Sequence, residues 1–297
     1  MGINRSFAQF LFYSRKKYAV SFDKTITLGR LKLYTAAEDI RRMTEKYGAA
    51  KQVQDIVFKD EYSEPLFELL GSTQPESMDY SDYEKATHLH DLNQPIAEQF
   101  KNEYDVVLDS GTLEHVFNFP VAVKSCMEML KPGGHFIGIT PANNYFGHGF
   151  YQFSPELHYR IFSAENGFTV RGMLVGVCGE DGEVEKWYEV KDPAEVRSRV
   201  MLVNSKPTYL FTIAQKTAVA AIFKASPYQS DYAATWQKGE EGKSGQAESG
   251  VKELYRKLVP GVVQKQVNKV RGWYSKPRLA DEYIGMTNAS HFKEVQL

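Results

Sequence analysis

Three aspartates follow three consecutive segments that we expect to form strands: Asp79, Asp91 and Asp109. In an open parallel sheet the carboxyl ends of the strands share one edge, and ligands bind there. One carboxylate at that edge can accept hydrogen bonds from both hydroxyls of a ribose, and a second can accept one from an adenine amino group. A single Asp after a strand is more often a helix N-cap. Three in series favour a nucleoside-binding edge.

Histidines after the same strands could take a proton from an acceptor. His115, beside Glu114, follows the strand that ends at Asp109, and His148 lies in the glycine- and aromatic-rich segment 143–151. Histidine titrates near neutral pH, which suits a general base. We therefore take His148, His115 and Glu114 as catalytic candidates. His115 could equally be a structural residue that is hydrogen-bonded to backbone.

The segment 143–153 also carries side chains that could contact an acceptor: Asn143, Asn144 and Tyr151. Its aromatic rings could stack on a sugar, although such a cluster is more often part of a core. His88 and His90 flank a strand and have no third ligand nearby in sequence. We interpret both as structural and predict no metal site.

Alternating strand and helix patterns must position these residues. The apolar run YDVVL at 104–108 is typical of a strand buried on both faces of a parallel sheet. We expect strands at 24–28, 75–79, 87–90, 104–108 and 135–140, helices at 31–47, 63–70, 113–130 and 155–165, and a final antiparallel pair at 168–177 and 208–214. This order predicts an α/β fold, a Rossmann-like, mostly parallel sheet with an antiparallel final strand, helices on both faces and a helical C-terminal extension.

Changes in composition divide the chain into four parts. Residues 1–23 are expected to form an N-terminal helical segment, and residues 24–225 the α/β domain. Residues 226–250 are polar, as in a linker or long loop, and residues 251–297 are expected to form a basic helical tail. The basic ends could suit an anionic surface or partner, although solvated helix faces explain them more simply. A homo-oligomer through the termini is a separate expectation.

Whole-chain composition excludes several classes of protein. The 297 residues contain 36 Lys and Arg against 37 Asp and Glu, so the net charge is −1. Duplex nucleic acid is therefore not the expected partner. Two cysteines are too few for a disulfide framework, and no apolar run is long enough to span a bilayer. We expect a cytoplasmic protein.

The chain resembles class I S-adenosylmethionine-dependent methyltransferases in the segment EYDVVLDSGTLEHV and in LKPGGHFIGITP, which follows it. The resemblance covers about residues 24–215 and is best at 105–141, where strand, turn, helix and Lys-Pro-Gly-Gly turn come in the family's order. The segments SMDYSDYEKATHLHDLNQPI and NNYFGHGFYQFSPELHYRIFSAENGF are similar to a mostly uncharacterised bacterial subgroup. Some members of this subgroup are associated with polysaccharide or sugar biosynthesis.

The resemblance implies S-adenosylmethionine as the cofactor and gives roles to the residues at the strand ends. In the place of the family's glycine-rich loop stand Leu28, Gly29 and Arg30. The residues that would hold the ribose are Asp79, Tyr80 and Ser81, and those beside the adenine are Asp91 and Leu92. The methionine part and the methyl-transfer site would be lined by Asp109, Ser110, Gly111 and Thr112.

Two departures from the family pattern bear on cofactor binding. Only Gly29 remains of the usual Gly-x-Gly-x-Gly, in which glycines let the backbone approach the ligand closely. Arg30 could instead meet the cofactor's carboxylate, or it could simply fill the site. Gly29 and Asp79 are 50 residues apart, against about 20 in an ordinary dinucleotide-binding unit. An insertion at 48–61 and an extra helix would account for the excess.

These observations favour an enzyme that transfers a methyl group to a small-molecule or sugar-like acceptor, in polysaccharide or secondary metabolite biosynthesis. The alternative is a methyltransferase-like binding or scaffold protein that has lost catalysis, which the missing glycines favour. Nucleic-acid methylation steered by the basic tail is a third option.

Overall fold

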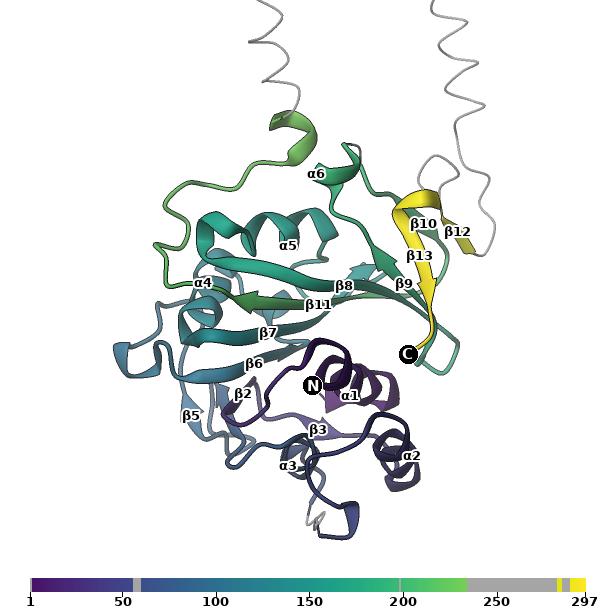
Figure 1. Ribbon diagram of the computed structural model, residues 1–297. Coiled ribbons are helices and arrows are strands. Elements are labelled where there is room, and N and C mark those ends of the chain that lie inside the picture. The colour runs from purple at the N-terminus through teal and green to yellow at the C-terminus, as the bar shows by residue number, and fades with distance from the viewer. Residues whose placement is uncertain (1, 56–59, 198, 234–281, 285–288) are drawn as a thin grey trace, which may run out of the picture.

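The structure is a computed structural model and describes residues 2–55, 60–197, 199–233, 282–284 and 289–297. Its main sheet has nine strands within the described residues, in the order β13-β9-β8-β11-β7-β6-β2-β4-β5 (Figure 1). In chain order the strands are β2 (Thr25–Leu28), β4 (Glu76–Asp79), β5 (His88–Leu89), β6 (Tyr104–Ser110), β7 (Leu130–Asn143), β8 (Phe168–Cys178), β9 (Val184–Val190), β11 (Thr208–Lys216) and β13 (Phe292–Val295).

The half of the sheet from β5 to β7 is parallel, as predicted. Ile26 of β2 lies between Glu76 of β4 and Val107 of β6. Every residue of β6 is buried, because helices cover both faces of the sheet and an apolar run can pack against both. The carboxyl ends of β2, β4, β5 and β6 therefore lie along one edge.

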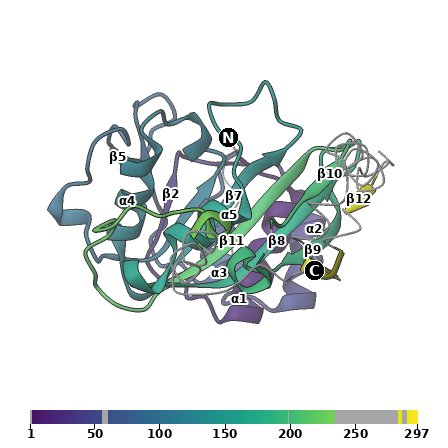
Figure 2. The ribbon, with the colours of Figure 1, turned by 90° about the horizontal axis from the view of Figure 1, so that it is seen from above.

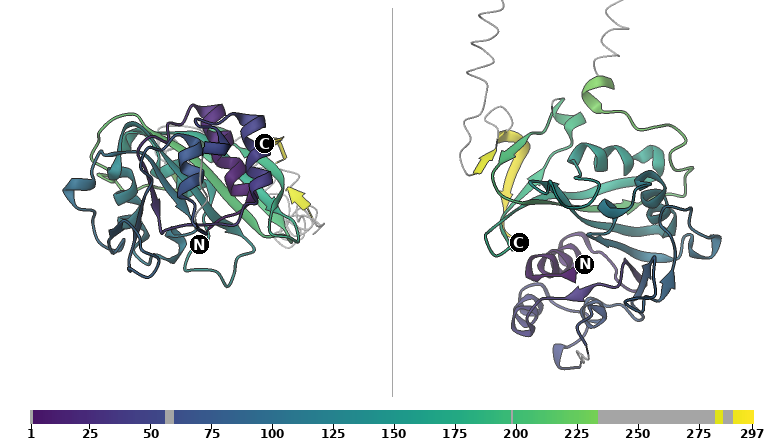
Figure 3. Two further views of the ribbon diagram at one scale, coloured as in Figure 1. Left: turned by 90° about the horizontal axis from the view of Figure 1, so that it is seen from below. Right: turned by 180° about the vertical axis from the view of Figure 1, so that it is seen from behind.

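The strand β11 runs antiparallel to both of its neighbours, which confirms the predicted antiparallel final strand. Leu210 pairs with Thr140 of β7 and with Val175 of β8. Two further antiparallel strands, β9 and β13, continue the sheet beyond β8, and β13 is the yellow arrow at this edge in Figures 1 and 3. The sequence analysis missed both of them.

The C-terminal tail differs from the expected helix where the structure describes it. Residues 292–295 form the edge strand β13, which pairs with β9 about a hundred residues earlier in the chain. The linker from 234 onward and the tail up to 281 lie outside the described residues, so the predicted helix there stays a prediction.

Helices cover both faces of the sheet, as predicted (Figures 1 and 2). On one face lie α1 (Arg5–Tyr18), α2 (Ala37–Tyr47) and α3 (Glu64–Leu70), and on the other lie α4 (Phe119–Met129) and α5 (Pro155–Ile161). Asn4 caps α1 by accepting a hydrogen bond of 2.9 Å from the amide of Phe7. The helix α3 ends at Leu70, as predicted, and Gly71 follows it as the C-cap.

Smaller elements complete the described chain. A parallel pair joins β1 (Gly2–Ile3) to β3 (Lys32–Leu33), and an antiparallel pair joins β10 (Leu202–Asn204) to β12 (Glu282–Ile284). The short helix α6 spans Pro193–Val196, and single 3₁₀ turns span Val53–Asp55, Glu98–Phe100, Leu113–His115, Ala164–Asn166 and Ala289–His291. No helix of the described part is long and apolar enough to cross a membrane.

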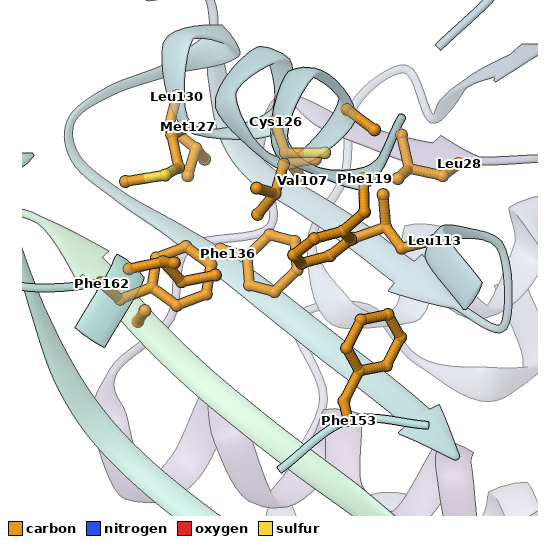
Figure 4. Packing of buried hydrophobic residues seen from close by; sticks show 14 of the residues in the cluster. Leu28, Val107, Leu113, Phe119, Cys126, Met127, Leu130, Phe136, Phe153 and Phe162 are labelled. Atoms are coloured by element: carbon orange, nitrogen blue, oxygen red, sulfur yellow. The ribbon is translucent and has the colours of Figure 1, made fainter. Parts of the chain in front are cut away.

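Aromatic side chains pack the helices onto the sheet. On the α4 side, the ring centroids of Phe119 and Phe153 are 4.9 Å apart, and Phe136 of β7 stacks on Phe162 at 4.7 Å (Figure 4). On the α1 side, Phe10 contacts Phe211 at 4.9 Å. Each such buried side chain contributes about 1.5–3 kcal/mol through the apolar surface removed from water. The strand ends are therefore held by a packed layer on each face.

Three predicted helices have different bounds in the structure, and one of them is α5, which ends at Ile161 instead of at residue 165. Residues 31–36 hold the short strand β3, and α2 starts only at Ala37. The predicted helix 113–130 is a 3₁₀ turn followed by α4, which starts at Phe119. Pro120 is tolerated in a first helical turn and would break a helix interior. His115 therefore lies in a tight turn at the strand end and not on the face of a long helix.

Candidate nucleoside-binding site

A pocket of about 550 Å³ lies at the carboxyl ends of β2, β4, β5 and β6. That volume is within the range of small-molecule sites. Its lining residues are Gly29, Met78, Asp79, Tyr80, His90, Asp91, Leu92, Asn93, Thr112, His115 and Val116. Seven of the predicted site residues are among them, from segments that are up to about 90 residues apart in sequence. The structure thus brings six of the twelve predicted strand-end residues together in one pocket, along with His115.

Asp79 and Asp91 line the same pocket, on the same edge of the sheet. Asp79 is half-buried at the end of β4, and its carbonyl oxygen accepts a hydrogen bond of 2.8 Å from the amide of His90. Asp91 Oδ1 accepts hydrogen bonds from the backbone and side-chain amides of Asn93, at 2.9 and 2.8 Å. These two bonds lower the pKa of the Asp91 carboxyl. The turn after β5 thus presents a fixed carboxylate to the pocket.

Gly29 connects β2 to the pocket. Its amide donates to the carbonyl oxygen of Met78 at 2.7 Å, which extends the parallel ladder by one residue. Its φ of 76° lies in the left-handed region, where a side chain is strained. Leu28 is fully buried, and its carbonyl oxygen accepts a hydrogen bond of 2.7 Å from Thr112 Oγ1. This bond ties the end of β2 to the turn after β6.

Arg30 turns away from the pocket. Its Nε lies 2.6 Å from Glu64 Oε1 at the start of α3, and its Nη1 donates to the carbonyl oxygen of Glu84 at 3.1 Å. The guanidinium also stacks on the ring of Tyr62, 3.8 Å from its centroid. Arg30 is not among the residues that line the pocket. In the structure the Arg30 guanidinium is thus engaged in an ion pair with α3.

The side chains of the turn Asp109–Thr112 mainly form hydrogen bonds to backbone groups. Asp109 is fully buried, and its Oδ1 accepts hydrogen bonds from the amides of Thr112 and Leu113, at 2.9 and 3.2 Å. Burial, and then the nearby Glu114, raise the pKa of the Asp109 carboxyl. Of the four residues predicted here, Thr112 alone lines the pocket. Asp109 thus has the capping role that a single strand-end Asp usually has.

Ser81, Ser110 and Gly111 also lie outside the pocket lining. The amide of Ser81 donates to Asp79 Oδ1 at 3.4 Å, and Ser110 Oγ is 3.4 Å from the carbonyl oxygen of Gly2. These two serines support the turns that carry the pocket residues.

The three catalytic candidates form one cluster beside the pocket. Glu114 Oε1 lies 3.3 Å from His148 Nε2, and the rings of His115 and His148 are 4.9 Å apart. The Glu114 side chain is 1% exposed, whereas that of His148 is 47% exposed. Burial raises the pKa of Glu114 to about 7. Burial, and then the neighbouring His148, lower the pKa of His115.

Backbone contacts fix His148 above Glu114. The amide of Phe150 donates to the carbonyl oxygen of Glu114 at 2.7 Å, and the amide of His148 donates to that of Tyr145 at 3.0 Å. Gly149 has a φ of 69°, and a Cβ at this position would lie 2.8 Å from the Glu114 carbonyl oxygen. The close approach of the two backbones therefore requires glycine at 149.

The predicted acceptor-binding residues have structural partners. The side-chain amides of Asn143 and Asn144 donate to Asn204 Oδ1 at 2.8 and 2.9 Å. The hydroxyl of Tyr151 donates to the carbonyl oxygen of Phe117 at 2.7 Å. None of these three side chains lines the pocket. Their contacts hold the 143–151 loop to the rest of the domain.

The aromatic side chains of that loop divide between core and surface. Phe153 is buried in the core, as expected for most such residues. Phe146 and Phe150 are exposed, and Phe150 contacts the equally exposed Phe117 edge-on at 5.9 Å between centroids. This exposed pair lies on the chain next to the catalytic candidates.

His90 was not predicted as a site residue. It lines the pocket, and its Nε2 lies 3.2 Å from the carbonyl oxygen of Gln94. His88 points elsewhere, with its Nε2 2.8 Å from Glu76 Oε2, which supports the structural interpretation. Met78, Asn93 and Val116 also line the pocket. Of these, Asn93 had a sequence signal, because an Asp two residues before an Asn is typical of a side-chain-stabilised turn.

A family comparison identifies part of this region. Residues 75–138 match the family model described as a methyltransferase domain. The match spans β4, β5, β6 and α4 and includes most of the pocket residues. The strand order β5-β4-β2-β6-β7-β11-β8, with β11 antiparallel, is that of a Rossmann-like methyltransferase sheet. The matched segment thus corresponds to part of a methyltransferase domain, which indicates S-adenosylmethionine as the cofactor.

Comparison with solved structures returns methyltransferases at low identity. TehB from Haemophilus influenzae is 11% identical, with 70% of this chain and 61% of that chain covered and a TM-score of 0.38. The trans-methyltransferase CalH, in complex with SAH, is 12% identical, with 71% and 55% covered and a TM-score of 0.38. A Burkholderia thailandensis 1,6-didemethyltoxoflavin-N1-methyltransferase is 12% identical, with 72% and 80% covered and a TM-score of 0.36.

The chain spans less than two thirds of the length of TehB and CalH. A comparison with curated proteins found no match.

Proposed function

We propose that this protein transfers a methyl group from S-adenosylmethionine to a small-molecule or sugar-like acceptor, in polysaccharide or secondary metabolite biosynthesis. The observation that carries the proposal is the convergence of Gly29, Asp79 and Asp91 on one pocket at the carboxyl edge of the parallel strands. That edge is where nucleotide cofactors bind in open α/β sheets.

The pocket residues suit the parts of a nucleoside. Both carboxylates line the pocket. That of Asp79 could accept hydrogen bonds from the two ribose hydroxyls, and that of Asp91 could accept one from an adenine amino group. Leu92 and Val116 offer apolar surface to the faces of the purine. In this arrangement Thr112 and His115 would lie toward the sulfur end of the cofactor. This chemistry supports a nucleoside as the occupant.

The chain's residues would have three tasks in the transfer. When bound, S-adenosylmethionine supplies an electrophilic methyl group, so no protein nucleophile is needed. The protein must hold the acceptor in line with that methyl, exclude water, and let the acceptor lose its proton. We assign the last task to the cluster of Glu114, His115 and His148, because His115 also lines the pocket.

Calorimetric titration with S-adenosylhomocysteine tests this function. We expect one molecule to bind per chain, and we expect Asp79→Ala to weaken binding at least about tenfold through loss of the charged hydrogen bonds to the ribose. Asp82→Ala is the matched control, because Asp82 is an exposed neighbour that pairs with Lys85 at 3.0 Å. If millimolar S-adenosylhomocysteine gives no heat of binding and no thermal shift, the proposed methyltransferase activity is rejected.

A binding or scaffold protein without catalysis is the second candidate. It is favoured by the loop after β2, where Gly29 is the single glycine and Arg30 pairs with Glu64. If this candidate holds, the chain binds S-adenosylhomocysteine weakly or not at all, and no acceptor is methylated in extracts supplied with labelled cofactor.

A further inference from the structure

We propose that Glu114, His115 and His148 bind a divalent first-row transition-metal cation at the rim of the pocket. Each of the three offers one ligand atom, and these atoms lie within 4.8 Å of one another. Among the described residues, these three form the one group of His, Cys, Asp and Glu side chains whose ligand atoms lie close enough together to share a metal ion. The sequence analysis considered His88 and His90 as possible metal ligands, found no third ligand and predicted no metal site.

The donor set fits such a cation. Two imidazoles and one carboxylate are the ligands that zinc, manganese and iron take in sites with open coordination positions. Calcium and magnesium prefer oxygen ligands alone, so they suit this set less well. Donor atoms around a first-row cation lie about 3 to 3.5 Å apart when its bonds are close to 2.1 Å. The Glu114 Oε1 and His148 Nε2 atoms, at 3.3 Å, already have that spacing.

A second observation points to a cation at this place. Glu114 is 1% exposed, and its Oε2 is buried without a hydrogen-bond partner among the described residues. The neighbouring Asp109 is fully buried, and its Oδ2 also lacks a partner there. A buried carboxylate normally has its oxygens paired, because desolvation of an unpaired oxygen is costly. A cation between Glu114 and the two histidines would offset that cost.

The surroundings allow a cation to enter and exchange. The His148 side chain is 47% exposed on its loop, while Glu114 is fixed below it by the hydrogen bond from Phe150 to its backbone. A small movement of the His148 ring therefore suffices to close the three ligands on one ion. His115 lines the pocket, so a free coordination position there would face the bound acceptor.

The cation's role, unlike its binding, rests on the proposed methyl transfer. An acceptor hydroxyl that coordinates a divalent cation loses its proton more readily, because the metal lowers the pKa of a bound oxygen. The oxygen would then form a bond to the methyl carbon as the methyl–sulfur bond of S-adenosylmethionine breaks, with its electron pair left on the sulfur of S-adenosylhomocysteine and the proton released to bulk solvent. The site therefore favours an acceptor with an oxygen next to a second donor atom, as in a vicinal diol of a sugar.

Titration of the full chain with Co²⁺ after removal of metals by EDTA tests the proposal. We expect one Co²⁺ per chain, seen by visible absorption, and Zn²⁺ should displace it. His148→Ala removes an exposed ligand without touching the core, and Glu114→Gln removes the charge. We expect each to weaken Co²⁺ binding at least about tenfold. His88→Gln is the matched control, because its imidazole pairs with Glu76 outside the cluster.

Two results would overturn the metal site: no Co²⁺ binding by the wild-type chain, or equal binding by wild type and His148→Ala. A parallel titration with S-adenosylhomocysteine in EDTA separates this outcome from failure of the proposed function. Nucleoside binding without Co²⁺ binding rejects the metal site alone. Co²⁺ binding without nucleoside binding rejects the methyl transfer and leaves the metal site in place.

Discussion

The amide of Phe150 donates a hydrogen bond of 2.7 Å to the carbonyl oxygen of Glu114, so the loop after β7 is fastened to the turn after β6. This contact joins two segments that follow neighbouring parallel strands. His148 lies two residues before Phe150, and His115 directly follows Glu114. The hydrogen bond between Phe150 and Glu114 therefore places both imidazoles over the one buried carboxylate of Glu114.

Substitution of Gly149 should separate the two histidines. In Gly149→Ala the new Cβ would lie 2.8 Å from the Glu114 carbonyl oxygen, at a φ of 69° that disfavours a side chain. We expect a loss of stability of about 1 kcal/mol or more and a weaker interaction of His148 with Glu114. Urea unfolding and the histidine resonances in NMR spectra measure these effects.

Gly147→Ala is the control for that substitution, because a Cβ at Gly147 meets nothing within 4 Å. It should leave both the stability and the histidine resonances close to those of the wild type. If the two variants behave alike, the close approach at Gly149 does not position His148.

Arg30→Ala should reduce stability and leave cofactor binding unchanged. The guanidinium pairs with Glu64 and stacks on Tyr62, and its side chain is 21% exposed, so we expect a loss of about 1 kcal/mol. Chemical unfolding measures this loss, and calorimetry with S-adenosylhomocysteine should give the wild-type affinity. A large drop in that affinity would mean that Arg30 meets the cofactor after all. Arg41→Ala, which removes an exposed partner of Glu38, is the stability control.

Stability should fall in mild acid because His158 is buried and uncharged. Its Nδ1 lies 2.7 Å from Thr212 Oγ1, and burial lowers its pKa to about 3. Between that value and the unfolded pKa of about 6.5, the unfolded chain binds a proton that the folded chain does not. The free energy of unfolding should therefore decrease as the pH falls through this window, by about 2 kcal/mol from pH 7 to pH 5 for this group.

The variant His158→Gln isolates that contribution. Between pH 7 and pH 5 its free energy of unfolding, measured with urea, should fall by about 2 kcal/mol less than that of the wild type. This difference does not depend on how stable the variant is at pH 7. Equal losses would show that His158 takes up a proton in the folded protein. His135, whose pKa burial lowers to about 4, acts in the same direction in both proteins.

Local sequence signals predicted the parallel half of the fold well. The run YDVVL could pack only as a strand covered on both sides, and β6 is buried throughout. The same alternation placed Asp79 and Asp91 at strand ends, and the structure brings them to one pocket. These predictions succeeded because they depend on periodicity and on the shared edge of parallel strands.

The failures came from contacts between distant residues. Nothing near Arg30 in sequence shows that its partner is Glu64, 34 residues further on. The strand β13 forms only because β9 leaves an edge to pair with, about a hundred residues earlier. The amides of Asn143 and Asn144 were expected at an acceptor, but Asn204 accepts their hydrogen bonds. No short motif carries such information.

A crystal structure of the chain with S-adenosylhomocysteine tests the central claim most directly. We predict the ribose hydroxyls within hydrogen-bonding distance of the Asp79 carboxylate, the adenine beside Asp91 and Leu92, and the sulfur toward Thr112 and His115. A nucleoside bound elsewhere on the chain, or in this pocket with its ribose away from Asp79, would contradict the account.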